Sequence, residues 1–258
     1  MNDREAVTWA EKFWRLAGQN EPFPRSLEAS IPWALPLVLV KLPRLGLLDV
    51  RLWLEQRGIP LQCSACDRAL EACLVARGGH GLIFLDGADP PDVQRFALAH
   101  EIAHFLIDYL GQRQRALERL GERILAVLDG CRPATKEERL SGVLRGVALG
   151  TFTHLMDRSA AGDVERLEVL AAEDRADRVA LELLAPHRVV VDRLKALGVR
   201  WRDPSAVLTV EEFLVQEFGL PVATARSYGR LLIMSRRSPC SFQEWMRPVE
   251  DSDADGKR

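Results

Sequence analysis

Apolar residues recur at every third or fourth position over much of the chain, which is the spacing typical of amphipathic helices. The first such stretch covers residues 2–17, and we interpret its Trp9, Phe13 and Trp14 as core residues rather than as a ligand cage. Further helices are predicted over 48–56, 94–110, 111–130, 135–158, 163–185, 187–202 and 207–234, the last broken at Gly219–Pro221. The pattern therefore predicts a mostly helical chain.

A different pattern occupies the region between residues 59 and 86. Three short apolar runs are separated there by turn-forming residues such as the pair Gly78–Gly79, which predicts strands over 59–66, 72–77 and 81–86. The last strand ends just before the helix predicted over 94–110. We therefore expect an α+β fold, mostly helical, with a small β-sheet next to that helix.

Prolines and charge suggest how the chain is divided. Residues 1–44 are expected to form an N-terminal helix and a Pro-rich linker, and residues 45–235 the main domain. Residues 236–258 form a C-terminal segment whose tail, EDSDADGKR, is acidic and poor in apolar residues. Such a tail cannot bury enough apolar surface to order itself, so we expect it to be disordered.

Composition narrows the class of protein. The chain has 258 residues with a formal net charge of −2, so it lacks the global basic field of a strong nucleic-acid binder. The early acids at its N-terminus are not typical of a signal peptide, so we expect none, and its most apolar early run, IPWALPLVLVKLP, is too short and too rich in proline to be expected to span a membrane. The five cysteines are irregularly spaced, which favours a reduced, cytoplasmic setting.

The helix predicted over 94–110 contains the motif HExxH, as His100-Glu101-Ile102-Ala103-His104. Residues i and i+4 lie on one helix face about a turn apart, so both imidazoles can reach one metal ion. Glu101 then lies near a metal-bound water, where it can act as a general base. Two histidines are only part of a catalytic zinc site, because a third protein ligand is needed.

A candidate third ligand lies in the helix predicted over 163–185. Glu173 and Asp177 share one face of that helix at spacing i, i+4. Glu173 can offer a carboxylate oxygen to the metal, and Asp177 can accept the free ring N–H of a liganding histidine. Taken alone, this segment would be a solvated charged face. Combined with HExxH, it predicts a zinc site made by His100, His104 and Glu173.

The segments RFALAHEIAHFL and EDRADRVALELLAP resemble the two motifs of the ImmA/IrrE family of metallopeptidases. The resemblance covers about residues 45–110 and 165–235, including the strand-like GLIFLDGADPPDVQ. It implies a gluzincin-like zinc peptidase in which Glu101 is the base and Asp177 orients His100. Manganese is the alternative metal, because the order of affinities alone does not fix which ion is bound.

The chain departs from that family in several places. Ala103, Arg175 and Ala185 stand where members usually have glycine, a second glutamate and methionine. The segment from about 111 to 162 separates the two motifs further than the family usually does, and we expect it to be an inserted helical hairpin. It is interpreted either as a lid or substrate-recognition element, with His154 near the metal, or as a packing element only.

The resemblance also implies a substrate. Members of the family cut DNA-binding repressors with XRE-type helix-turn-helix domains, in the induction of mobile elements or in stress responses after DNA damage. Such a repressor is the expected protein partner here. The candidates for stabilising the oxyanion or contacting the substrate are His154, His187, Arg226 and Tyr228.

Two weaker signals leave alternatives open. Cys63, Cys66, Cys73 and His80 could form a small zinc knuckle, but strand alternation favours structural cysteines. The pair of helices over 207–234 resembles a helix-turn-helix, and we interpret it as peptidase scaffold, with DNA binding as the alternative. The alternative function is therefore a non-proteolytic regulator that uses the peptidase fold to bind DNA or a partner protein.

Overall fold

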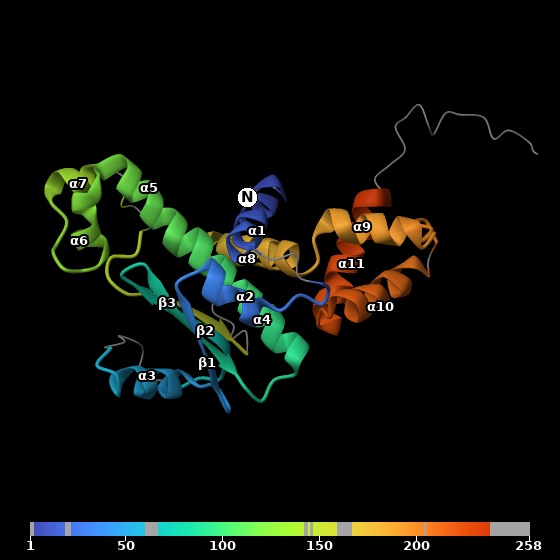
Figure 1. Ribbon diagram of the computed structural model, residues 1–258, viewed down its shortest axis with the longest axis horizontal. Coiled ribbons are helices and arrows are strands. Elements are labelled where there is room, and N and C mark those ends of the chain that lie inside the picture. Colours follow the sequence, from blue (N-terminus) through green and yellow to red (C-terminus); the bar gives the residue numbers. More distant parts are fainter. Residues whose placement is uncertain are drawn as a thin grey trace, which may run out of the picture.

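The computed structural model describes residues 3–18, 22–59, 67–141, 144, 147–158, 167–203 and 205–237. A small sheet lies at the centre of one half of the molecule, with helices on both of its faces (Figure 1). The predicted α+β class, mostly helical with a small sheet, is confirmed. Among the described residues, no helix combines the length and the apolar character needed to cross a membrane.

The sheet has four strands in the order β1-β3-β2-β4. Strand β1 pairs with β3 in parallel, while β2 pairs antiparallel with both β3 and β4. The two edge strands are therefore β1 and β4. Their bounds are β1 Leu37–Leu42, β2 Leu70–Arg77, β3 His80–Asp86 and β4 Phe152–Asp157.

Alternate side chains of the strands enter two different cores. Leu74 and Ile83 are fully buried in the larger core, which they share with the helix that carries HExxH. Cys73 and Phe84 point to the other face and pack against the helix α3, Leu47–Glu55. The sheet is thus a middle layer, and its larger core faces the helices that carry the candidate site.

Most helices lie on the side of the sheet that faces the larger core, and they extend beyond both ends of the sheet (Figure 1). Helix α4, Pro91–His104, continues through the π-helix η1, Phe105–Leu110, into α5, Gly111–Leu120. Helix α8, Leu167–Leu184, packs against both α4 and α1. The remaining helical elements are α1 Asp3–Ala17, α2 Leu27–Ala34, η2 Glu122–Ile124, α6 Leu125–Leu128, α7 Lys136–Leu140, α9 His187–Ala196, α10 Ala206–Phe218 and α11 Val222–Arg237.

Several elements differ from the sequence-based expectation. The segment expected to be a Pro-rich linker contains α2 and β1. The helix predicted over 135–158 is wrong: among the residues of this range that the structure describes, only α7 is helical, and the chain then forms strand β4. Gly150 has a φ of +92°, which no continuing helix accommodates, and pairing with β2 then decides the conformation. Residues 60–66 of the strand predicted over 59–66 lie outside the described residues, as does the tail 238–258.

Asp86 fixes the end of β3, where the chain turns towards α4. Its buried carboxylate accepts hydrogen bonds from the backbone N–H groups of Arg44, Leu45 and Ala88 at 2.8–3.1 Å, and from Arg158 Nη2 at 2.8 Å. Burial alone would raise the pKa of Asp86, but these hydrogen bonds outweigh it and lower the pKa. The charged carboxylate therefore stabilises the fold.

We expect Asp86→Asn to lower the free energy of unfolding by about 2 kcal/mol at pH 7, because hydrogen bonds to a buried charge are lost. A lowered pKa in the folded state stabilises above the unfolded pKa, so this difference shrinks as the pH falls through the folded pKa. Urea denaturation at several pH values measures it. Asp192→Asn is the control: its exposed pair with Lys195 spans 3.6 Å, and its loss should change stability by less than about 0.5 kcal/mol. Equal losses in both variants would contradict the assignment.

Candidate metal centre

Three elements that are distant in sequence bring the candidate site together. Helix α4 supplies His100, Glu101 and His104, helix α8 supplies Glu173, and strand β4 supplies His154. His100, Glu101 and His104 are buried, because the face of α4 that carries them is covered by α8 and the sheet. The sequence therefore placed the first four of these residues on the correct elements, while His154 reaches the cluster from an unpredicted strand.

The nitrogen and oxygen atoms of this cluster converge. One donor atom from each of His100, His104, His154 and Glu173 lies within 4.8 Å of the others, so the cluster could hold a metal ion. His100 Nε2 lies 3.1 Å from His104 Nε2 and 3.1 Å from Glu173 Oε2, and His104 Nε2 lies 3.6 Å from Glu173 Oε1. Ligand atoms of one tetrahedral zinc ion lie about 3.4 Å apart, so these three residues fit such an ion.

The outward-facing nitrogens of the two motif histidines are each bonded to a carboxylate. His100 Nδ1 lies 2.9 Å from Asp177 Oδ1, and His104 Nδ1 lies 2.7 Å from Asp108 Oδ2. An ionised carboxylate can only accept, so each Nδ1 carries a proton and Nε2 is the nitrogen directed at the cluster, where it would offer its lone pair to a bound metal. Sequence reasoning predicted the role of Asp177 but missed Asp108, although its spacing of four residues from His104 was a usable signal.

His154 lies between two glutamates. Its Nδ1 is 3.0 Å from both carboxylate oxygens of Glu101, and its Nε2 is 3.0 Å from Glu173 Oε1. Its ring stacks on His104 with the centroids 3.6 Å apart. Imidazoles bound through Nε2 to one tetrahedral ion have centroids about 5 Å apart. The His100–His104 separation of 4.8 Å fits that value, whereas the His104–His154 separation does not.

The charges of the cluster depend on one another. Burial lowers the pKa of His154, but the carboxylates of Glu101 and Glu173 outweigh it and raise the pKa to about 10. Burial also lowers the pKa of His100, but the hydrogen bonds to Asp177 and Glu173 outweigh it and raise the pKa to about 9. Burial would raise the pKa of Glu173, but hydrogen bonds from the three histidines hold that pKa well below its ordinary range. The carboxylates of the cluster are thus paired with the positively charged imidazoles of His100 and His154.

The other candidate contacts lie on elements outside this cluster. Tyr228 is buried on α11 and donates to the Ala185 carbonyl at 3.2 Å, and Arg226 forms an ion pair with Glu211 across the α10–α11 pair. His187 is the first residue of α9, and its backbone N–H donates to Glu182. These contacts join neighbouring helices to one another. Tyr109, five residues after His104, is buried, and its hydroxyl accepts from the backbone N–H of Gly79.

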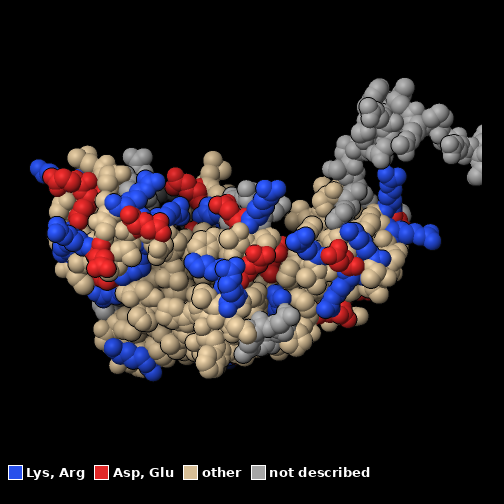
Figure 2. Space-filling model, turned by 45° about the horizontal axis from the view of Figure 1, so that its top comes forward, with Lys and Arg blue, Asp and Glu red and all other residues tan. Residues whose placement is uncertain are grey.

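The two weaker signals have different outcomes. Of the proposed zinc knuckle, Cys63 and Cys66 lie outside the described residues, Cys73 is buried in β2, and His80 is exposed at the start of β3. The helices predicted over 207–234 form as α10 and α11, joined by Gly219 in the left-handed conformation. Basic and acidic side chains are interspersed on the face that Figure 2 shows, without a large area of one sign.

Comparison with known proteins adds no relative to this description. Neither the protein-family models, nor the curated proteins, nor the solved structures compared with the chain include a match to it.

Proposed function

We propose that the chain is a zinc-dependent endopeptidase whose metal is held by His100, His104 and Glu173. The observation that carries this proposal is the convergence of two HExxH imidazoles and a carboxylate from a second helix at separations that suit one ion. Each imidazole also has the carboxylate partner expected of a metal ligand. Manganese remains the alternative ion.

Three protein ligands leave room for water and substrate, which distinguishes a catalytic zinc site from a structural one. When bound, zinc would lower the pKa of a coordinated water and polarise the carbonyl of the scissile peptide bond. His154 is excluded from the ligand set proposed here because its ring stacks on His104 instead of diverging from it. The fourth coordination position of the metal would therefore be open to water and substrate.

The chain's own residues would move the protons. Glu101 is fully buried beside the cluster, where one carboxylate oxygen can take a proton from the attacking water and pass it to the leaving amine. His154 would present an N–H from Nε2 to the carbonyl oxygen as that oxygen gains negative charge. Its other nitrogen, on Glu101, holds the ring in the orientation this requires.

The substrate we propose is a DNA-binding repressor with an XRE-type helix-turn-helix domain. This part rests on the resemblance of RFALAHEIAHFL and EDRADRVALELLAP to the ImmA/IrrE family, whose members cut such repressors. Cleavage would then relieve repression of a mobile element or of a stress response. The proposed site of action is the cytoplasm, where such repressors and their DNA are found.

The experiment that tests this function combines metal analysis with proteolysis. The purified chain is expected to bind one zinc ion and to cut an XRE-type repressor encoded near its gene. A chelator should stop cleavage, and added zinc should restore it. A chain that binds zinc but cuts neither this repressor nor an unfolded protein substrate would contradict the peptidase assignment and favour a regulator that acts by binding.

A further inference from the structure

We propose that Asp108 is a positioning residue of the metal site: it holds the His104 ring and, through Arg175, ties the helix of the two histidines to the helix of Glu173. This inference rests on the metal site proposed above, and it does not depend on the identity of the substrate. It assigns a role to a residue that neither HExxH nor the Glu173–Asp177 pair includes.

The contacts of Asp108 use both of its carboxylate oxygens. Oδ2 accepts from His104 Nδ1 at 2.7 Å, and Oδ1 accepts from Arg175 Nη2 at 3.1 Å. The first bond fixes which nitrogen of His104 carries the proton and in which direction Nε2 points. The second bond reaches helix α8 between Glu173 and Asp177, which are the two α8 residues that contact His100. One carboxylate thus connects both halves of the site.

The backbone around Asp108 is unusual in the same place. The α-helical hydrogen bonding of α4 ends at His104, and residues Phe105–Leu110 form the π-helix η1, an element often found at functional sites. Helix α5 resumes at Gly111, where a Cβ would lie 3.1 Å from the Leu106 carbonyl and 3.4 Å from the Trp9 ring. A side chain at Gly111 would crowd the Leu106 carbonyl, so glycine suits the point where the π-helix that carries Asp108 joins α5.

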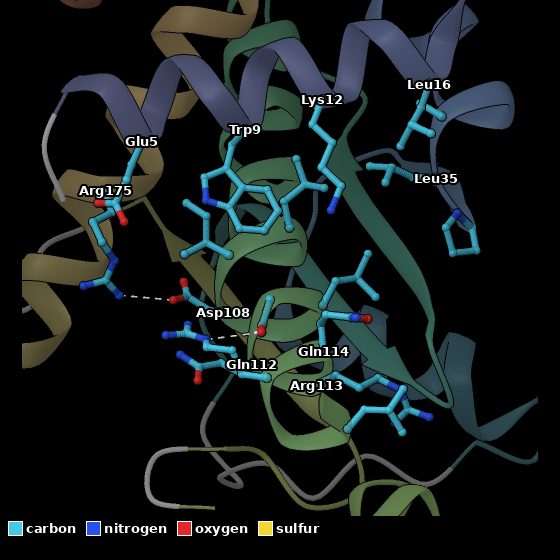
Figure 3. A pocket seen from close by; sticks show the side chains of 18 of the residues that line it. Glu5, Trp9, Lys12, Leu16, Leu35, Asp108, Gln112, Arg113, Gln114 and Arg175 are labelled. Carbon is cyan, nitrogen blue, oxygen red and sulfur yellow. Dashed lines mark hydrogen bonds and ion pairs between the residues drawn. The ribbon is translucent and has the colours of Figure 1, made fainter. Parts of the chain in front are cut away.

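Asp108 and Arg175 line a groove of about 940 Å³ between α1 and the α4–α5 helix. Figure 3 shows Arg175 directed at Asp108, with Glu5 and Trp9 of α1 beside them. The side chains of Asp108 and Arg175 are 16% and 29% exposed, so water reaches the ion pair. Asparagine has nearly the same shape as aspartate, so Asp108→Asn changes the charge of this pair without leaving a cavity. This change should therefore alter the metal site without unfolding the chain, which makes the role measurable.

The test measures zinc affinity by competition with a chromogenic chelator, using the full chain. Asp108→Asn is expected to weaken zinc binding about 10- to 100-fold, which is the usual effect of losing a carboxylate behind a liganding histidine. Arg175→Gln should weaken it in the same direction but less, because Asp108 keeps its bond to His104. Both variants should also shift the visible absorption bands of the cobalt-substituted protein, because the ligand field changes when His104 turns.

Asp174→Asn is the matched control. Asp174 also lies on α8 and pairs with an arginine, Arg178, at 2.9 Å, but it is exposed and is no member of the metal cluster. It should leave the zinc affinity and the cobalt spectrum as in the wild type. Wild-type affinity and spectrum in both Asp108→Asn and Arg175→Gln would overturn the positioning role alone. A wild-type chain that binds no zinc would overturn the metal site itself, and this inference with it.

Discussion

Glu101→Gln is expected to reduce peptide hydrolysis about 10²- to 10⁴-fold while leaving the metal bound, because general acid–base catalysis contributes an effect of that size. Glutamine has nearly the same shape as glutamate but cannot take a proton from water at neutral pH. The Glu101 side chain is fully buried and is no member of the proposed ligand set, so metal content should not change. The loss should therefore fall on kcat.

The measurement is the rate of repressor cleavage together with the zinc content of the same preparation. Glu118→Gln is the control, because Glu118 lies on the exposed side of α5 and is bonded to Gln114. It should cleave at the wild-type rate. Cleavage by Glu101→Gln at the same rate as Glu118→Gln would rule out Glu101 as the base, even if both proteins carry one zinc ion per chain.

The histidine pair of the candidate metal site was predictable from sequence because its placement depends on local geometry. The four-residue spacing of His100 and His104 fixes their common face once the segment is helical, and the apolar pattern of 94–110 indicates a helix. Glu173 and Asp177 follow the same rule on α8. The position of Glu173 and Asp177 next to α4 depends on tertiary structure. It could be expected because a two-histidine site needs a further ligand and a carboxylate behind a liganding imidazole.

The strand that carries His154 and the alignment of Asp108 lay beyond this reasoning for different reasons, although His154 itself was named as a candidate near the metal. Strand β4 forms because it pairs with β2, some eighty residues earlier, and the 135–158 segment by itself has apolar residues at helical spacing. Asp108 stands at the right spacing from His104, but its alignment depends on a π-helix, whose hydrogen-bond pattern has no reliable sequence signal. Long-range pairing and irregular helices are where the sequence pattern is least informative.

His154→Ala is expected to lower kcat about 10²- to 10³-fold, which is the usual effect of removing one donor to a developing oxyanion. The proposed donor is His154 Nε2, on the side of the cluster that faces Glu173 Oε1. Zinc affinity should fall by no more than about 100-fold, because His154 contacts the ligand Glu173 but its stacked ring is not placed as a ligand beside His104. KM should change little, since the contact forms fully only as charge develops on the carbonyl oxygen.

Steady-state kinetics and zinc competition on the same protein separate this role from that of a fourth ligand. If His154 bound the metal, its ring would close the open direction, and the site would be structural or latent. His154→Ala would then weaken zinc binding by more than about 100-fold and leave cleavage unchanged or raise it. His80→Ala is the control, because this exposed histidine at the start of β3 contacts the Gly78 carbonyl and lies outside the cluster. It should match the wild type in both measurements.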